Sequence, residues 1–381
     1  MGKLEFCEAV ATMVGCIVGA GIFGVPYVIA QAGFLTGVLT IIVLGLVVLM
    51  IYLYLGEVVL RTRGRHQLTG YAEIYLGRWG KRIMAFSMVF GIYGSLTAYL
   101  IGEGSAISSI LGGPQAIYTL LFFIVAAAIV YAGLGALEKS ELFTMTLIFI
   151  VTIIIIVFTS PHIEMPNLSG FSISRFFVPY GVILFSYLGM MSIPEVREIL
   201  EHDKRKMKKA VFAGMAIPII LNLVFSFVIV GAVGLSRFNS MAPNDRIATI
   251  ALGEVVMPSL FVIANIFAVF AMFTSFIAVA FALKEMFIYD YNIDRRLSWA
   301  LTCFIPLFIA LSGLTTFVEA LGVVGVVAGG IDSILIVLMF HRAKSMGNRK
   351  PEYSVTGHPL LSTLIIGLFI TGAFFMLAGF F

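Results

Sequence analysis

The sequence predicts an all-α integral membrane protein of eleven transmembrane helices, arranged as a five-plus-five inverted repeat in which helices 1 and 6 are broken. Three observations carry this prediction. The composition is 60% hydrophobic and 12% charged, whereas a soluble domain has roughly twice that charged fraction. Long apolar segments fill the chain. Two of these segments are interrupted by glycine and proline at matching positions of the two halves, which is typical of inverted-repeat transporters.

A transmembrane helix needs about 20 mostly apolar residues. The eleven predicted segments run approximately over 8–30, 34–58, 82–110, 116–136, 141–160, 175–198, 208–234, 258–287, 297–313, 317–340 and 360–380. No room is left for a separate soluble domain, so residues 1–381 form one transmembrane domain. Its first repeat covers about 8–160, its second about 175–340, and an additional helix about 360–380.

The basic residues are divided unequally between the two predicted membrane faces. With a cytoplasmic N-terminus, 21 of the 24 Lys and Arg residues, Lys139 among them, fall on the inner face. This is a strong positive-inside bias, which predicts an N-in, C-out multi-pass protein of the plasma membrane. The net charge of +4 is therefore no sign of a nucleic-acid partner. No secretory signal peptide is evident, because the first apolar run has no small-residue cleavage site.

The first segment contains VGAGIFGVPY, which has Gly19, Gly21, Gly24 and Pro26 within a stretch long enough to cross a bilayer. Glycine costs about 1 kcal/mol and proline about 3 kcal/mol relative to alanine inside a helix. Unwound chain at membrane depth is tolerated only against protein or a water-filled cavity. The stretch therefore predicts a helix break that lines a binding site, and close helix–helix contact through small residues is the alternative.

A second interrupted segment, FFVPYGVILFSYLGMMSIPEV, lies five spans later and so crosses the membrane in the opposite direction. The third segment of each half, 82–110 and 258–287, is unusually long, and a short amphipathic pattern precedes each of them. These features repeat at matching positions and support the inverted repeat.

Three stretches together resemble a known family. GAGIFGVPYVIAQAG resembles the first-helix motif of amino-acid permeases, and YGSLTAYLIGEGSAI and SYLGMMSIPEV support that placement. The chain is identified as a member of the amino acid–polyamine–organocation superfamily, near its amino acid/auxin and hydroxy/aromatic amino acid branches. The resemblance covers essentially the whole chain and implies a LeuT-type fold and amino-acid transport by alternating access.

The breaks would supply the binding chemistry, because half-helices expose unpaired N–H groups at one end and C=O groups at the other. We expect the substrate carboxylate at the amides of Gly19, Ala20 and Gly21, and its ammonium near the carbonyls of Val18, Phe185 and Ser186. Side chains would then select the substrate. The candidates are Phe23, Tyr93, Tyr99, Tyr187, Leu188 and Phe270, although aromatic residues on membrane helices more often pack or lie at the interface.

A cation site is predicted at the sequence AMFTSF, where Ala271, Thr274 and Ser275 place one carbonyl and two hydroxyls near one point of a helix. These are suitable ligands for a hard cation. The pattern resembles the second sodium site of symporters that share this fold, which implies Gly15 and Val18 carbonyls as partners and slightly favours Na⁺ over H⁺. The alternative is that both hydroxyls bond the backbone one turn earlier. No other cofactor or metal is expected.

Acidic residues within membrane segments are functional candidates. Glu103, Glu195 and Asp332 are candidate proton sites or gates, and a proton carrier among them would contradict Na⁺ coupling. Glu57 is expected to be a solvated helix end beside Arg61.

The predicted function is cation-coupled uptake of an amino acid. An exchanger or an amino-acid sensor of the same fold is the alternative, and a channel is less favoured because the chain shows no selectivity ring. No phosphate-binding GxxxxGK[ST] loop is present, which argues against an ATP-driven pump, and nothing indicates an enzyme. The sequence does not indicate which amino acid is carried or the oligomeric state.

Overall fold

The computed structural model describes residues 2–133, 141–289 and 291–378. Lys139, which we assigned to the inner face, lies outside these residues, as do the ends of the predicted segments 116–136 and 360–380. Every regular element in the described part of the chain is a helix.

The helices follow the predicted segments closely. The α-helices are α1 (Gly2–Ile17), α2 (Gly21–Ala32), α3 (Phe34–Arg61), α4 (Leu68–Leu111), α5 (Gln115–Ala132), α6 (Glu141–Thr159), α7 (Tyr180–Phe185), α8 (Ser192–Ile199), α9 (Met207–Ser240), α10 (Ala248–Ala251), α11 (Pro258–Tyr289), α12 (Arg295–Leu311), α13 (Phe317–Val324), α14 (Gly330–Met346) and α15 (Pro359–Leu377). A π-helical turn, η8 (Gly325–Gly329), joins α13 to α14.

Seven helices in the described part of the chain are long and apolar enough to cross a membrane, and the bent pair α1–α2 raises this number to eight. The other three predicted segments correspond to α6, to the short pair α7 and α8, and to the 17-residue α12. An integral membrane protein with several spans is therefore clear, whereas the number eleven and the inverted repeat stay predictions.

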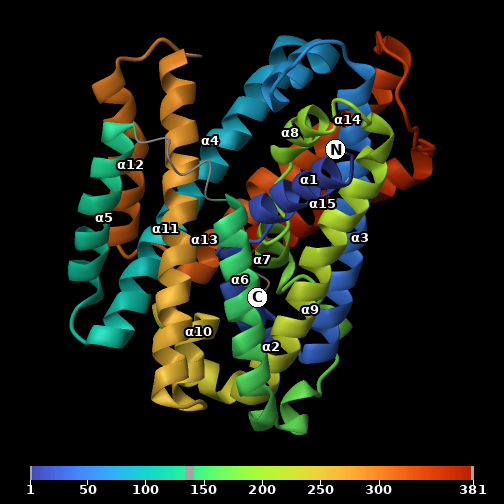
Figure 1. Cartoon of the computed structure of the whole chain (residues 1–381). Coiled ribbons are helices and arrows are strands. Elements are labelled where there is room, and N and C mark those ends of the chain that lie inside the picture. Colours follow the sequence, from blue (N-terminus) through green and yellow to red (C-terminus); the bar gives the residue numbers. More distant parts are fainter. Residues whose placement is uncertain (1, 134–140, 290, 379–381) are drawn as a thin grey trace.

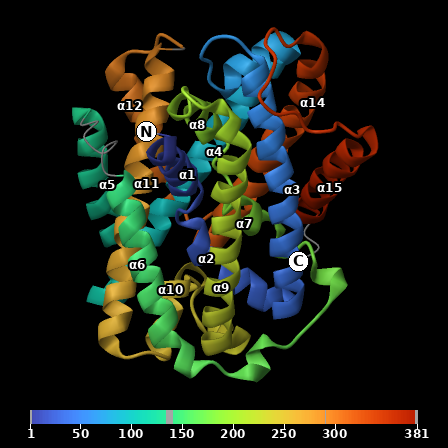
Figure 2. The ribbon, with the colours of Figure 1, turned by 45° about the vertical axis from the view of Figure 1, so that its right-hand side comes forward.

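The helices form two groups around the interrupted elements (Figures 1 and 2). Helices α5, α11 and α12 contact one another on one side, and α1, α3 and α9 pack together on the other. Helix α4 contacts α5, α11 and α12 and also reaches α13 and α14. The short helix α7 lies between α2, α3 and α13, so both interrupted segments are surrounded by protein.

The predicted long third segments are present. Helix α4 has 44 residues because the amphipathic stretch before it continues into the span across a kink at Gly77, whose φ is 74°. Only glycine adopts such a positive φ without strain. Helix α11 has 32 residues and follows the short helix α10, whose four residues are all buried.

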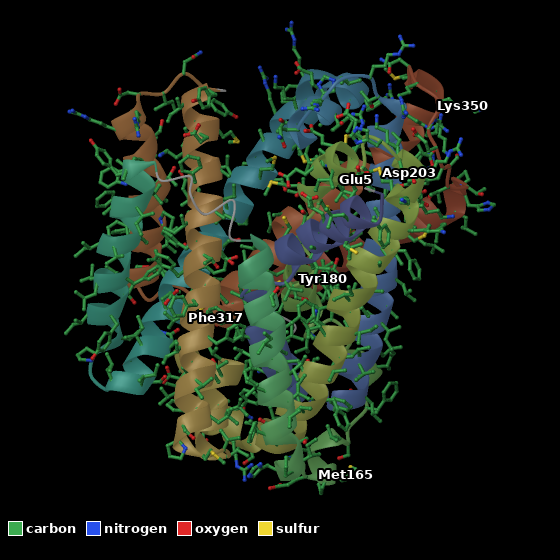
Figure 3. The ribbon with its side chains drawn as sticks, in the orientation of Figure 1. Glu5, Met165, Tyr180, Asp203, Phe317 and Lys350 are labelled. Carbon is green, nitrogen blue, oxygen red and sulfur yellow. The ribbon has the colours of Figure 1, made fainter. Side chains whose placement is uncertain are left out.

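Loops predicted for opposite membrane faces lie at opposite ends of the molecule. Figure 3 shows Glu5, Asp203 and Lys350 at one end and Met165 at the other. We call the first of these the inner end, in line with the positive-inside prediction. Which end faces the cytoplasm stays a prediction.

Glu57 corrects one expectation. Its side chain is completely buried rather than solvated. The carboxylate accepts hydrogen bonds from Arg61 Nε at 2.7 Å, Ser354 Oγ at 3.1 Å and the Val355 amide at 2.6 Å, and it pairs with Lys344 Nζ at 2.7 Å. The expectation was wrong because three of these partners come from a segment almost 300 residues further along the chain.

Candidate functional site

The first predicted break is present. Helix α1 ends at Ile17, α2 begins at Gly21, and the two helix axes differ by 58°. In the described part of the chain, no backbone hydrogen bond engages the amides of Gly19, Ala20 and Gly21. Pro26 does not contribute to the break, because it lies inside α2. The glycines alone therefore mark the break, and three amides remain available for a ligand.

The second interrupted segment is also unwound. Helix α7 ends at Phe185 and α8 begins at Ser192. The intervening backbone is held from outside, because the Tyr52 hydroxyl donates to the Tyr187 carbonyl at 3.0 Å. Pro194 lies in the first turn of α8, where the backbone amides lack intrahelical partners in any case. The segment is thus two short helices joined by six irregular residues, as the sequence predicts.

The two breaks are in direct contact. A Cβ atom on Gly21 would lie 2.8 Å from the Cα of Ser186 and 3.0 Å from Cδ1 of Phe185. On the other side, a Cβ on Gly189 would lie 2.6 Å from Ile17 Cγ1 and 3.3 Å from the Cys16 carbonyl carbon. The two interrupted segments therefore meet at close range, and the Phe185 and Ile17 side chains lie beside the glycine contacts.

Several predicted side chains gather around this contact. The Phe23 ring meets Phe267 of α11 edge to face, with centroids 5.9 Å apart. Tyr99 is buried, and the Ser275 hydroxyl oxygen of α11 lies 3.6 Å from where a Cβ of Gly19 would be. Aromatic groups from α2, α4 and α11 thus meet beside the first break.

Other predicted side chains lie differently. Leu188 packs against Gly329 of η8, and Tyr93 is half-buried. The Tyr187 hydroxyl donates to the Ile41 carbonyl at 3.3 Å, so its ring lies toward α3. Phe270 does not join the group, because its side chain is 56% exposed.

The predicted cation ligands also come close to the first break. Both hydroxyls, however, bond the backbone one turn earlier: Thr274 Oγ1 donates toward the Phe270 and Ala271 carbonyls at 3.1 Å, and Ser275 Oγ donates to Ala271 at 2.9 Å. The Ala271 carbonyl is therefore already fully used. The hydroxyl oxygens of Thr274 and Ser275 still have lone pairs that could bind a cation. Among the described residues, no amide donates to the carbonyls of Gly15 or Val18, so these oxygens are also available.

The three candidate acids occupy different environments. Glu103 on α4 is completely buried, and neither carboxylate oxygen has a hydrogen-bond partner among the described residues. Asp332 lies half-buried in the first turn of α14, directly after η8, and its Oδ1 atom has no hydrogen-bond partner among the described residues. Glu195 is exposed in the first turn of α8, where a carboxylate favours the positive end of the helix dipole.

The structure adds a residue that sequence reasoning missed. Asn222 of α9 is buried, and its Nδ2 donates to Ser186 Oγ at 3.3 Å. The Ser186 hydroxyl itself donates to Ile183 at 2.8 Å, so it must accept from Asn222, which fixes the amide orientation. Asn222 Oδ1 then has no partner among the described residues. The available signal was a lone amide within the apolar run IPIILNLVFSF.

Comparison with known proteins identifies the family of the chain. The sequence profile described as the "Tryptophan/tyrosine permease family" matches residues 3–376. The chain is 24% identical to the tyrosine-specific transport system 1 of Haemophilus influenzae, over 94% of this chain and 93% of that protein. It is 25% identical to glutamine transporter 2 of Aliivibrio fischeri, over 82% of each.

Among solved structures, the chain is similar to MhsT in complex with L-phenylalanine. The TM-score is 0.70 at 17% identity, and the superposition covers 97% of this chain and 98% of that one. At this identity the likeness establishes a shared fold. Because the family profile spans nearly the entire sequence, the protein belongs to the tryptophan/tyrosine permease family, whose members are membrane permeases for amino acids and not enzymes.

Proposed function

We propose that this protein takes up an aromatic amino acid by cation-coupled alternating access. The observation that carries the proposal is the contact between Gly21 and Ser186, which brings two unwound stretches together in the interior of the bundle. Two interrupted helices that meet near the midplane form the substrate site in inverted-repeat transporters. Relatives named as tyrosine transport systems and a tryptophan permease support an aromatic substrate.

The free backbone groups suit an amino-acid zwitterion. The amides of Gly19, Ala20 and Gly21 would receive the carboxylate at the positive end of α2, and the carbonyls that end α1 and α7 would receive the ammonium. The amide oxygen of Asn222 adds one more acceptor at the second break. The aromatic side chain would then lie toward Phe23 and its neighbours. The backbone would recognise what all amino acids share, and the rings would select among them.

Na⁺ is the coupling ion that we favour. The hydroxyls of Thr274 and Ser275 and the free carbonyls of Gly15 and Val18 fit a hard cation, whereas the Ala271 carbonyl fits poorly because it already accepts both hydroxyls. A bound cation would add positive charge beside the first break. One charge moving inward through about 100 mV supplies roughly 2.3 kcal/mol, enough for about 50-fold accumulation.

Purified protein in liposomes tests the proposal. Radiolabelled tryptophan or tyrosine should enter against its gradient when an inward Na⁺ gradient is imposed, and excess unlabelled substrate inside should accelerate entry by counterflow. The double variant Thr274→Ala, Ser275→Ala should lose the Na⁺ stimulation. A protein that binds substrate but shows neither uptake nor counterflow would be a sensor, which would refute the proposed function.

The same liposomes distinguish the coupling ions. Accumulation driven by a pH gradient alone, and unaffected by the double variant, would contradict Na⁺ coupling. It would make Glu103 and Asp332 the residues to test, by Glu103→Gln and Asp332→Asn, because Glu103 of α4 is completely buried and the half-buried Asp332 of α14 has a buried Oδ1 atom.

A further inference from the structure

The connection between α14 and α15, residues 347–358, folds back over the inner end of α3; we call it the inner strap. It is fastened by backbone groups, because the amides of Asn348 and Arg349 both donate to the Arg61 carbonyl at 3.1 Å. The Tyr353 hydroxyl donates to the Leu53 carbonyl at 2.8 Å. The strap joins two apolar helices, so it lies at the boundary between bilayer and water.

The fastening leaves positive charge without compensation. Glu57 is shared between Arg61 and Lys344, each at 2.7 Å, so it balances only one of them. Arg349 pairs with Glu352 and donates to the Leu60 carbonyl at 2.7 Å. Lys350 has no hydrogen-bond or ion-pair partner among the described residues and is exposed at the inner end (Figure 3). The cluster thus contains four positively charged side chains and two carboxylates, those of Glu57 and Glu352, which leaves a net charge of two positive.

A hollow of about 560 Å³ opens between the strap and α3. Its lining is basic and polar and includes no acidic side chain: Arg61, Gly347, Asn348, Arg349, Lys350, Pro351 and Ser354. Glu57 accepts a hydrogen bond only from the Nε atom of Arg61. The two terminal nitrogens of this guanidinium can therefore donate bidentate hydrogen bonds to an anion. The backbone bonds above hold the walls in place before any ligand arrives.

We propose that this hollow binds the phosphate headgroup of an anionic glycerophospholipid from the inner leaflet. Basic pockets at the cytoplasmic ends of membrane helices attract such headgroups. The neighbouring helix α15 offers acyl chains an apolar surface, because Leu360 is 73% and Leu364 62% exposed. Arg61 and Lys350 would hold the phosphate, and the uncompensated charge would favour phosphatidylglycerol over the zwitterionic phosphatidylcholine.

The test is lipid retention by the full-length protein, purified in detergent and measured by native mass spectrometry together with thermal unfolding. Phosphatidylglycerol should be retained and should raise the melting temperature more than phosphatidylcholine of the same acyl composition, and high salt should weaken the difference. Lys350→Gln should weaken phosphatidylglycerol retention about fivefold, as expected for one basic residue at an anionic surface, and Lys350→Glu should abolish it.

Lys81→Gln is the matched control, because Lys81 is an exposed inner-end lysine of α4 outside the hollow that pairs with Glu73. It should retain phosphatidylglycerol as the unchanged protein does. Equal retention of both lipids, or full retention by Lys350→Glu, would overturn the proposal. Inorganic phosphate or glycerol phosphate that stabilises the protein as well as the lipid does would also overturn it, by making the site one for a soluble anion.

Discussion

Replacing Gly21 with alanine should impair transport because the added methyl group has no room. Its carbon would lie 2.8 Å from Ser186 Cα and 3.1 Å from Ser186 Cβ, whereas carbon atoms pack at about 3.5–4.0 Å. Ser186 cannot yield locally, since its amide donates to Val182 at 2.9 Å and its hydroxyl to Ile183 at 2.8 Å. Helices α2 and α7 must therefore separate by more than half an ångström.

The expected magnitude follows from this overpacking. Extra methyl groups in a well-packed interior cost about 1–3 kcal/mol. Alanine also favours the helical state of α2 by up to about 1 kcal/mol over glycine, but this gain is common to every conformation that keeps α2 helical, so it cancels within the transport cycle. The conformation that joins the two breaks should be disfavoured by the full amount. Uptake in liposomes should fall roughly five- to 150-fold, while thermal stability changes less.

Gly19→Ala is the matched control two residues away. Its methyl carbon would meet only the Ser275 hydroxyl oxygen, at an ordinary distance of 3.6 Å, and its φ is not in the positive region. Any loss of uptake should therefore be smaller than that of Gly21→Ala, because the added methyl group makes no close protein contact. Normal uptake by Gly21→Ala would refute the proximity argument. Equal losses of uptake in both variants would show that these positions need glycine for its backbone flexibility and not for the close contact with Ser186.

Three further predictions concern the supporting structure. Gly325→Ala should prevent correct folding, because its Cβ would lie 1.8 Å from a backbone oxygen of α7, whereas Gly330→Ala, with open space around it, should insert and purify normally; equal yields would contradict this. Glu57→Gln should lower the free energy of unfolding by about 3 kcal/mol, because a buried ion pair loses one partner, and an unchanged denaturation curve would refute that role. Burial alone would raise the pKa of Glu352, but the hydrogen bonds and charge of Arg349 outweigh it and hold that pKa below its usual value. This pair should therefore stabilise the protein above about pH 4.3, the unfolded pKa, and lose its effect as the pH falls through the lower folded pKa. Melting temperatures of the unchanged protein and Glu352→Gln should converge at low pH, and a constant difference would contradict the reasoning.

The sequence was sufficient to locate both breaks, because clustered glycines disfavour a continuous helix, whereas Pro26 and Pro194 lie inside α2 and α8. It was not sufficient to assign side chains to the site. Phe267 and Phe270 are both aromatic and lie three residues apart on α11, yet Phe267 packs on Phe23 while Phe270 is exposed. Their directions differ by only about 60° around the helix. Which of them faces inward depends on the rotation of α11, which is set by its neighbours.

Long-range partners were also beyond the sequence. Glu57 followed by Arg61 is the ordinary pattern of a solvated helix end. No residue near Glu57 in the sequence indicates that the inner strap will cover its side chain. The same holds for Asn222, whose partner Ser186 lies 36 residues earlier. Local patterns specify where a helix opens or ends. The contacts that give those openings their chemistry depend on how distant segments dock.

The close contacts around α7 suggest how the two breaks keep their positions relative to each other. On one face, Gly21 of α2 brings its backbone against Ser186. On another, the Gly325 position would place a Cβ 2.7 Å from the Phe185 amide nitrogen. Backbone of α2 and of η8 thus lies close to the end of this six-residue helix on two faces, with the Phe185 ring beside the Gly21 contact. Since packed interfaces shift between discrete arrangements and do not deform continuously, a movement of α2 or of the π-helical turn must carry the second break with it. Gly21 therefore both lies at the first break and, together with Gly325 on another face of α7, couples α2 and η8 to the second break.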